Sequence, residues 1–443
     1  MKKGTMWAAI ALSMMASVAL SGCSSDSNSQ EPELIIDPVM PPITTTLTRA
    51  EQEMVNQSNT FAFNLFREAQ DEVKSQILSP ISITYALGML NNGAAGETLA
   101  QINRVLGFEK TGADSINAFC YKMLNMAPAL DPLTKVMIAN NIYVNKFYVL
   151  NPNFVKKMNV FYDAEPETRD FYDGKTMDVI NQWASDHTEQ MIQKVLDEKE
   201  FNPDAVSYLL NAIYFKGAWA MKFDKKETVK EEFIHAGATK ELIMRPMMHQ
   251  MGEFDYAETD GYQALRLPYG NGSYAMTVLL PMKETNALPK VPTVEEWEKL
   301  NKLMAGRTVD VKLPSFETDT NINLKPIMMA LGMTEAFDDR KANFPNFCDV
   351  SVYIQLMKQV AKIKLDEEGT EASAVTNARH YDALTRAHSH LLRVLDGLNN
   401  NLSGDLLSED LRLTLDTLAE ITGGQITPNE VLGNIFKNFC VGK

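Results

Sequence analysis

Residues 206–215, with the sequence VSYLLNAIYF, form a nearly continuous apolar run. A strand that packs on one side alternates apolar and polar residues, whereas a strand covered on both faces is apolar along its length. The run therefore predicts a strand inside a large sheet, with other elements packed on both of its faces. The 443 residues of the chain are enough for such a layered core, built as one large domain or as two to three ordinary ones.

The rest of the chain is predicted to mix helices with long strands. Residues 59–72 carry apolar side chains at helical spacing, and Ser79 followed by Pro80 predicts the start of a second helix. Residues 270–273, GNGS, predict a hairpin turn. Further strands are predicted where the sequence alternates or runs apolar, at residues 134–144, 274–280, 309–316 and 352–365. Because there is no regular βαβ repeat, the sequence predicts an α+β fold and not a doubly wound one.

The chain begins with the pattern of an export signal. Lys2 and Lys3 precede an apolar run over residues 6–20, which is too short to span a membrane comfortably and leads to Leu-Ser-Gly-Cys, ending at Cys23. This ending resembles a bacterial lipobox, and the resemblance implies that residues 1–22 are removed and that Cys23 is the lipidation site. A membrane partner and a place in the cell envelope, at the outer membrane or the cell surface, are then expected. An ordinary signal peptide with an incidental cysteine is the alternative.

The chain is acidic, with 42 Lys+Arg against 57 Asp+Glu and a formal net charge of −15. Nucleic acids are bound by clusters of Lys and Arg, so no nucleic-acid partner is expected. The four cysteines lie far apart and form no CxxC pair, which argues against a disulfide framework and against a zinc site. Residues 23–58, which begin with a stretch rich in Ser, Pro and acidic side chains, are predicted to be a lipidated N-terminus and a flexible tether.

Eight short blocks follow one another in the middle of the chain: SPISI at 79–83, ALGM at 86–89, GAAGET at 93–98, INQW at 180–183, NAIYFKGAW at 211–219, MHQ at 248–250, LGM at 331–333 and DEEGTEA at 366–372. In this order they resemble the signature of the serpin family. The resemblance implies a serpin fold, an α+β architecture of large mixed sheets with surrounding helices, over residues 59–375.

The last block has the physical properties of a hinge. Gly369 permits a change of backbone direction, after which small uncharged residues share one face of an extended segment and can enter a crowded sheet interior. Glu371 and Ser373, on the other face, are expected to stay in water. In inhibitory serpins this segment is the hinge of the reactive loop. The resemblance therefore implies a hinge within residues 366–375, formed by Glu367, Glu368, Gly369, Thr370, Glu371, Ala372, Ser373 and Ala374.

A hinge of this kind implies an inhibitor and not an enzyme. In inhibitory serpins the reactive loop enters the central sheet after a protease cleaves it, and the protease stays attached as a distorted acyl-enzyme. The resemblance implies the same suicide-substrate mechanism here, with a serine or cysteine protease as the partner and with no cofactor. Neither HExxH, GxSxG nor a glycine-rich dinucleotide loop occurs in the sequence, and no metal site is predicted.

Residues 376–443 follow a different pattern. Apolar residues recur at helical spacing and predict a three-helix segment, with stripes over residues 384–398, 407–418 and 431–439. The first helix, taken from Thr376, would carry three histidines without forming a metal pair, namely His380, His388 and His390. The C-terminal strands that a serpin has after its hinge are missing from this pattern. Their loss would leave backbone groups of the main sheet without partners, so poor folding or a relaxed, non-inhibitory state is expected.

The tail also contains the motifs NARHY at 377–381, LRL at 411–413, EITG at 420–423 and FCVGK at 439–443. These resemble the C-terminal end of MnmE-type tRNA-modification GTPases. The resemblance implies that Cys440 corresponds to the terminal cysteine that this family links to tRNA modification; an inert cysteine at a helix end is the alternative. A GxxxxGK[ST] phosphate loop is absent from the sequence, so no GTPase site is predicted.

Three functions stay open on these grounds. The first is a cell-envelope serpin that traps a serine protease, impaired by its replaced C-terminus. The second is a serpin-fold binding protein of the envelope that does not inhibit. The third is a tRNA-modification role of the tail, which the acidic charge and the export signal disfavour. Because helical sequence replaces the part of the loop that a protease would cut, no scissile residue is assigned.

Overall fold

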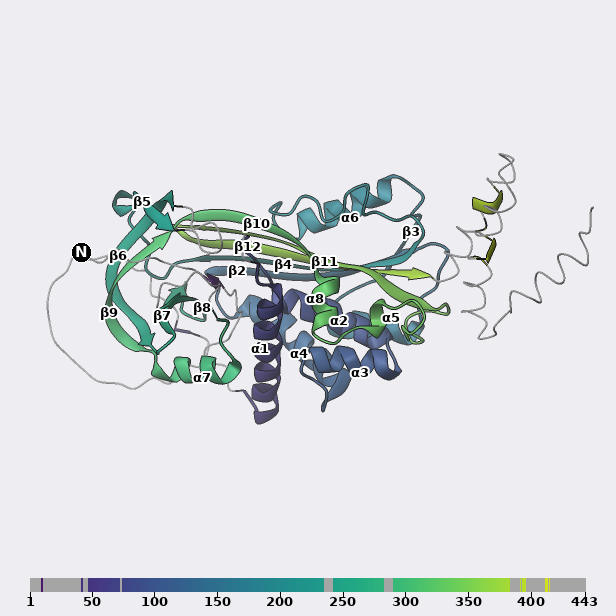
Figure 1. The fold of residues 1–443 in the computed structure, drawn as a ribbon, viewed down its shortest axis with the longest axis horizontal. Coiled ribbons are helices and arrows are strands. Elements are labelled where there is room, and N and C mark those ends of the chain that lie inside the picture. The colour runs from purple at the N-terminus through teal and green to yellow at the C-terminus, as the bar shows by residue number, and fades with distance from the viewer. Residues whose placement is uncertain are drawn as a thin grey trace, which may run out of the picture.

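The computed structural model describes residues 9–10, 41–42, 47–71, 74–234, 242–282, 290–382, 391, 393–395, 411–412 and 414, and places them in two β-sheets with surrounding helices (Figure 1). The helices are α1 (Arg49–Ala69), α2 (Pro80–Gly93), α3 (Gly96–Val105), α4 (Gly112–Met126), α5 (Pro152–Tyr162), α6 (Lys175–Asp186), α7 (Val294–Leu303) and α8 (Leu324–Ala330), with short 3-10 turns η1 (Ala127–Ala129), η2 (Lys225–Glu227) and η3 (Glu335–Phe337). The strands are β1 (Ala9–Ile10), β2 (Thr134–Asn145), β3 (Glu167–Arg169), β4 (Ala205–Ala218), β5 (Val229–Ile234), β6 (Leu242–Glu258), β7 (Tyr262–Tyr269), β8 (Tyr274–Pro281), β9 (Ala305–Pro314), β10 (Phe316–Asn323), β11 (Val352–Asp366) and β12 (Gly369–Asp382).

The main sheet has the strand order β10-β11-β12-β4-β2-β3 in the described part of the chain. β4 contains the apolar run predicted at 206–215, and it is buried continuously from Ala205 to Phe215. α6 lies over one face of the sheet, and α2, α4 and α5 lie under the other (Figure 1). The prediction of a strand covered on both faces is therefore confirmed. The predicted α+β architecture of mixed sheets with surrounding helices is confirmed as well.

Local signals explain where the first helices begin. Ser79 Oγ accepts a hydrogen bond from the main-chain nitrogen of Ser82, and Pro80 is the first residue of α2, as predicted. α1 begins at Arg49, ten residues before the predicted helix, because Thr48 and Glu51 form a reciprocal capping box. Residues 49–58, which were predicted to belong to a flexible tether, are therefore helical.

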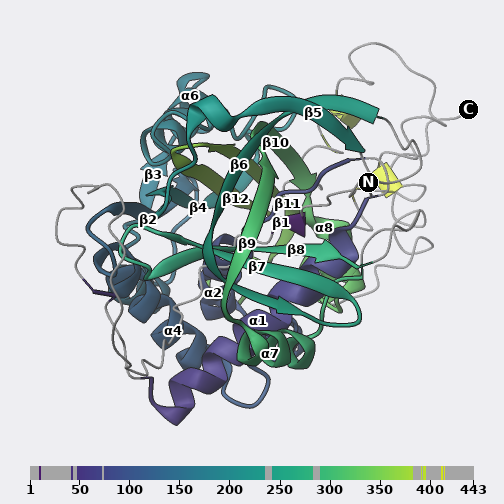
Figure 2. The same ribbon diagram turned by 90° about the vertical axis from the view of Figure 1, so that its left-hand side faces the viewer.

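The second sheet has the order β1-β8-β7-β6-β5, with β9 paired to β6, among the residues that the structure describes (Figure 2). The turn predicted at 270–273 joins β7 to β8, which ends at Pro281, one residue beyond the strand predicted at 274–280. Asp131 clamps this turn, since its carboxylate accepts from Thr134 Oγ1 at 2.6 Å and from the main-chain nitrogen of Asn271 at 3.3 Å. Gly270 has a φ of +46°, and a Cβ atom there would lie 2.0 Å from Asp131 Oδ2, so glycine is required.

Strand β12 corrects the prediction for the start of the tail. A helical segment is predicted from Thr376 onward, but β12 runs through this position and ends at Asp382. The neighbouring strands provide the reason. β11 and β4 pair with the segment along both of its edges, and this tertiary context outweighs a local helical pattern whose apolar stripe begins only at Leu384. The strand predicted at 309–316 is also corrected, because it is divided after Pro314 into β9 and β10.

Beyond Asp382 the structure describes a few residues, all of them helical: Leu391, Arg393, Val394, Leu395, Leu411, Arg412 and Thr414. They fall within the first two helices predicted for the tail, and none of these described residues is in a strand. The predicted third helix lies outside the described residues, as do Cys23, His388, His390 and Cys440.

Candidate functional site

The residues predicted to form a hinge lie at the turn between β11 and β12 and along the first half of β12 (Figure 1). Glu367 and Glu368 form the turn, and the residues from Gly369 to Ala374 belong to the strand. β12 pairs antiparallel with β11 on one side and with β4 on the other. The predicted hinge therefore lies at the centre of the main sheet.

Polar contacts hold the turn from outside. The carboxylate of Glu368 accepts from Lys222 Nζ at 2.7 Å and from Lys225 Nζ at 3.0 Å, and these hydrogen bonds lower the pKa of Glu368 to about 2. The three side chains are more than half exposed, so solvent screens the pairs and they contribute little to stability. Glu367 Oε1 accepts from Thr228 Oγ1 at 2.7 Å. The segment that follows β4 thus positions the turn.

The backbones of β12 and β4 approach each other closely at Gly369. A Cβ atom at this residue would lie 2.0 Å from the main-chain oxygen of Gly217 and 2.8 Å from Ala218 Cα. Both are backbone atoms, which cannot give way without a shift of the strand. The close approach of the two backbones therefore requires glycine at this position.

Small side chains of β12 are buried on one face. Thr370, Ala372 and Ala374 are 2%, 4% and 3% exposed. The hydroxyl of Tyr269 donates to Thr370 Oγ1 at 2.6 Å, which satisfies the polar atom in this row. Successive side chains of a strand point to opposite faces of the sheet, so these three share the buried face, where their small size lets them fit.

The opposite face of β12 is only partly in water. Glu371 Oε1 accepts from the hydroxyl of Tyr214 at 2.5 Å, and Glu371 Oε2 lies 3.5 Å from Lys216 Nζ. Burial, followed by the bond to Glu371, raises the pKa of Tyr214 above its ordinary value. Ser373 is only 5% exposed, and its Oγ has no hydrogen-bond partner in the structure. The expectation that Ser373 stays in water is wrong, because Tyr214 and Lys362 flank it on the neighbouring strands.

Thr376, in the middle of β12, is held by side chains that the sequence analysis did not identify. Its Oγ1 lies 2.7 Å from Ser82 Oγ on α2 and accepts from Gln359 Nε2 at 2.8 Å. Gln359 also joins β11 to the start of α2, since its side-chain amide donates to the main-chain oxygen of Ser79 and accepts from its nitrogen. Polar residues within apolar stretches were the sequence signal that could have revealed this network.

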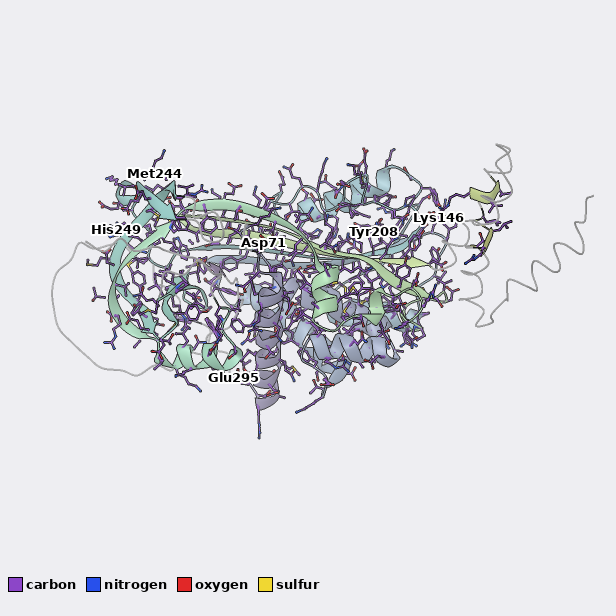
Figure 3. The ribbon with its side chains drawn as sticks, in the orientation of Figure 1. Asp71, Lys146, Tyr208, Met244, His249 and Glu295 are labelled. Carbon is purple, nitrogen blue, oxygen red and sulfur yellow. The ribbon has the colours of Figure 1, made fainter. Side chains whose placement is uncertain are left out.

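Charged groups near the end of β12 are buried under the segment that follows α6. Lys358 on β11 is 3% exposed, and its Nζ donates to both carboxylate oxygens of Glu200, at 2.7 and 2.8 Å. Arg379 donates to the main-chain oxygen of Glu200 and lies over the ring of Tyr208, which Figure 3 labels below α6. A buried ammonium needs a charged partner, because its removal from water costs several kcal/mol. The segment around Glu200 therefore fastens β11 and β12 to the α6 side of the sheet.

Asn377 is fully buried, and neither atom of its side-chain amide has a hydrogen-bond partner in the structure. An unpaired buried polar group costs about 1–3 kcal/mol. The variant Asn377→Val is therefore expected to raise the free energy of unfolding by about 1–2 kcal/mol. Urea denaturation at pH 7 measures this gain.

The matched control is Asn211→Val on β4. Asn211 is equally buried, but its Nδ2 donates to Asn140 Oδ1 at 2.9 Å. This variant loses a hydrogen bond and is expected to be less stable than the wild type. A gain in both variants, or in neither, would contradict the interpretation of Asn377.

The described residues do not assemble a metal site, since no group of three or more His, Cys, Asp and Glu side chains among them is placed to hold an ion. Cys120 and Cys348 are buried free thiols. Burial raises the pKa of both, that of Cys348 to about 11, so neither is a reactive thiolate at neutral pH. Within the same residues, no helix is both long enough and apolar enough to cross a membrane.

The predicted lipidation site Cys23 and the terminal Cys440 lie outside the described residues. His380, which was predicted to lie on a tail helix, is instead a buried residue of β12, because the strand extends to Asp382.

Comparison with known proteins relates this arrangement to one family. The family model described as Serpin (serine protease inhibitor) matches residues 56–394. Neuroserpin of Gallus gallus is 30% identical over 344 residues, which cover 74% of this chain and 82% of the relative. Serpin B6 of Macaca fascicularis is 30% identical over 334 residues, with coverage of 73% and 89%. An uncharacterized serpin-like protein of Thermococcus kodakarensis is 30% identical over 336 residues, with coverage of 74% and 76%.

Solved structures show the same architecture. Ovalbumin from emu, Dromaius novaehollandiae, has a TM-score of 0.70 and 25% identity, with 74% of this chain and 90% of that chain covered. The cleaved Serpin 42Da has a TM-score of 0.69 and 26% identity, with coverage of 75% and 91%. Tengpin, a thermophilic serpin solved in its latent state, has a TM-score of 0.68 and 27% identity, with coverage of 75% and 90%.

Proposed function

The chain belongs to the serpin family, and from this premise we propose that it inhibits a serine protease with residues 369–382 as its reactive loop. The observation that carries the proposal is the position of β12, a full-length strand between β4 and β11 that buries a row of small residues. A loop that has to enter a sheet needs small side chains on the face that points to the core. It also needs a glycine where its backbone turns close to the backbone of the neighbouring strand. Ala372, Ala374 and Gly369 meet these needs.

In the proposed mechanism the loop is first outside the sheet, where the nucleophile of a protease attacks one of its peptide bonds. That bond breaks, the upstream part of the loop stays on the protease as an acyl-enzyme, and the downstream part is released with a new amino terminus. The loop then enters between β4 and β11, so that its backbone gains hydrogen-bonding partners along both edges. This gain, with the burial of side chains such as Val375, supplies the free energy that displaces the attached protease. The nucleophile belongs to the protease, so the inhibitor needs no catalytic group and no cofactor.

A serpin-fold binding protein without inhibition is the second candidate. It is favoured by one observation, that β12 already occupies the sheet in the intact chain. A chain that stays in this arrangement has no exposed loop to offer a protease. The sequence of the tail predicts helices and not the C-terminal strands of a serpin, which also favours a binding protein without inhibition. The likeness of the tail to MnmE-type GTPases stays a prediction, with Cys440 as its counterpart cysteine.

The place of action is also part of the proposal. The lipobox-like ending at Cys23 supports a lipoprotein of the cell envelope, in which residues 23–48 link the lipid to α1. The intact mass of the purified native protein tests this part, because removal of residues 1–22 and acylation of Cys23 change it in a defined way. An unprocessed N-terminus would contradict it.

The inhibitory role is tested by incubating the chain with trypsin-like, chymotrypsin-like, elastase-like and papain-like proteases. We expect a 1:1 complex that survives SDS with at least one serine protease. Thr370→Arg puts a charge at a buried position of β12 and should be cleaved without forming a complex, whereas Glu371→Gln, at the partly exposed neighbour, should still form it. The absence of any such complex would contradict inhibition.

Thermal unfolding of the cleaved chain separates the two candidates. If the loop enters the sheet only after cleavage, the cut chain should unfold at a markedly higher temperature than the intact one. If β12 is already in place, cleavage after Asp382 should leave the unfolding temperature unchanged, as expected for the binding protein.

A further inference from the structure

His380 on β12, a central strand of the main sheet, is completely buried. Its ring stacks on Phe347, with centroids 4.2 Å apart and planes at 29°, and it meets the edge of Phe344 at 5.4 Å. Nδ1 lies 3.0 Å from Ser207 Oγ on β4, and Nε2 has no hydrogen-bond partner in the structure. A neutral imidazole fits this environment, since one nitrogen is satisfied by the hydroxyl and the ring contacts two aromatic side chains.

If the ring of His380 were protonated, the titratable groups on the surrounding strands would not neutralise its positive charge. On β12 itself, Asp382 follows on the same face, and its carboxylate accepts from the hydroxyl of Tyr148 at 3.2 Å. Arg379 and Tyr381 alternate to the opposite face, where Arg379 contacts Tyr208 of β4. β11 pairs with His380 through the apolar residue Ile354.

The other elements packed nearby contribute no charge to the ring. The segment that holds Phe344 and Phe347 continues into Cys348, a buried thiol that burial keeps neutral. α5 presents Phe154 to Phe347. The titratable side chain of α2 is Tyr85, whose hydroxyl donates to the main-chain oxygen of Cys120. Burial alone lowers the pKa of His380, to about 3, and no neighbouring charge shifts it further.

Protonation therefore opposes the inserted position of this residue. A protonated His380 would carry an N–H at Nε2 without an acceptor and a positive charge between two phenylalanine rings. In water an imidazole binds its proton at about pH 6.5. We propose that His380 makes insertion of β12 depend on pH, so that insertion is fully favoured at neutral pH and becomes progressively less favourable as the pH falls below about 6.5. The proposal rests on the proposed function only in taking β12 as the reactive loop.

The direction follows from proton binding in the two states. The pKa of His380 is lower in the inserted state than in the solvated loop, so the inserted state binds fewer protons between about pH 3 and pH 6.5. Insertion is therefore fully favoured above pH 6.5 and weakens about tenfold for each pH unit below it. Between pH 7.0 and pH 5.0 the equilibrium should shift by about 25-fold toward the solvated strand.

Hydrogen exchange of the full-length chain tests this shift. Mass spectrometry of peptides from β12, corrected for the intrinsic pH dependence of exchange, should show the opening of the strand increase about 25-fold from pH 7.0 to pH 5.0 in the wild type. In His380→Phe and His380→Gln the increase should fall below about threefold, because the titrating group is gone. His249→Gln is the matched control, since His249 lies on β6 beside Asp310, outside the main sheet (Figure 3), and this variant should behave like the wild type.

Equal pH profiles for the wild type and both His380 variants would overturn the proposal. His380→Gln keeps the experiment decisive if the phenylalanine variant does not fold. Nuclear magnetic resonance of labelled histidine rings is a second test. The His380 signal should not titrate between pH 7.5 and pH 5 in the folded chain, and a titration midpoint near pH 6.5 would also overturn the proposal. Neither readout depends on protease inhibition, so failure here is distinguishable from failure of the proposed function.

Discussion

With β12 in the sheet, as in the structure, replacement of Ala374 by glutamate is expected to lower the free energy of unfolding by about 3–5 kcal/mol. Ala374 is 3% exposed and pairs with Ala361 on β11 and with Ile213 on β4. A carboxylate at this position would lose its water and would lie between apolar cross-strand neighbours. The position is central in the sheet, so the strand cannot move aside without breaking both ladders. Urea denaturation at pH 7.5, followed by tryptophan fluorescence, measures the loss.

The matched control is Asn321→Glu. Asn321 is exposed on β10, the edge strand of the same sheet, so this variant adds the same charge at a hydrated position. Its free energy of unfolding should stay within about 0.5 kcal/mol of the wild type. Equal losses in the two glutamate variants would show that charge and not burial is responsible, and the importance of a small residue at 374 would then be refuted.

The variant Gly369→Ala is expected to destabilise the chain by about 1–3 kcal/mol through a single methyl group. That group would lie 2.0 Å from the main-chain oxygen of Gly217, so β12 and β4 would have to separate where the strand begins. Hydrogen exchange in the first half of β12 should increase together with the loss in urea stability.

Gly261→Ala is the control for this variant. A Cβ atom at Gly261 meets no heavy atom within 4 Å, and the substitution should change stability by less than about 0.5 kcal/mol. If both alanine variants unfold at the same urea concentration as the wild type, the close approach at Gly369 is not a constraint on the fold.

The parts of the fold that could be predicted are those in which local sequence and environment agree. The run at 206–215 predicts a strand buried on both faces, and the structure confirms it as β4. The alternation after Gly369 likewise predicts which side chains of β12 are small and buried. The start of α2 is predicted by Ser79 and Pro80, which act within a single turn.

The parts that could not be predicted depend on residues far apart in the sequence. Residues 376–382 are extended because two strands flank them, and no local pattern contains that information. Gln359 contacts Ser79 across 280 positions, and Glu200 contacts Lys358 across 158. Such pairs decide which polar residues of a strand are satisfied, so the burial of Ser373 and Asn377 was beyond the reach of periodicity alone.

The strand order of the main sheet also has a consequence for synthesis. Gly369 of β12 pairs with Ala218 of β4, which a ribosome produces 151 residues earlier. At about 5–20 residues per second, β4 waits about 8–30 seconds for the strand that completes one of its edges. β2, made before β4, can cover the other edge at once. The buried strand β4 is therefore left half-paired during translation, and the nascent chain has to be protected from other chains until β12 emerges.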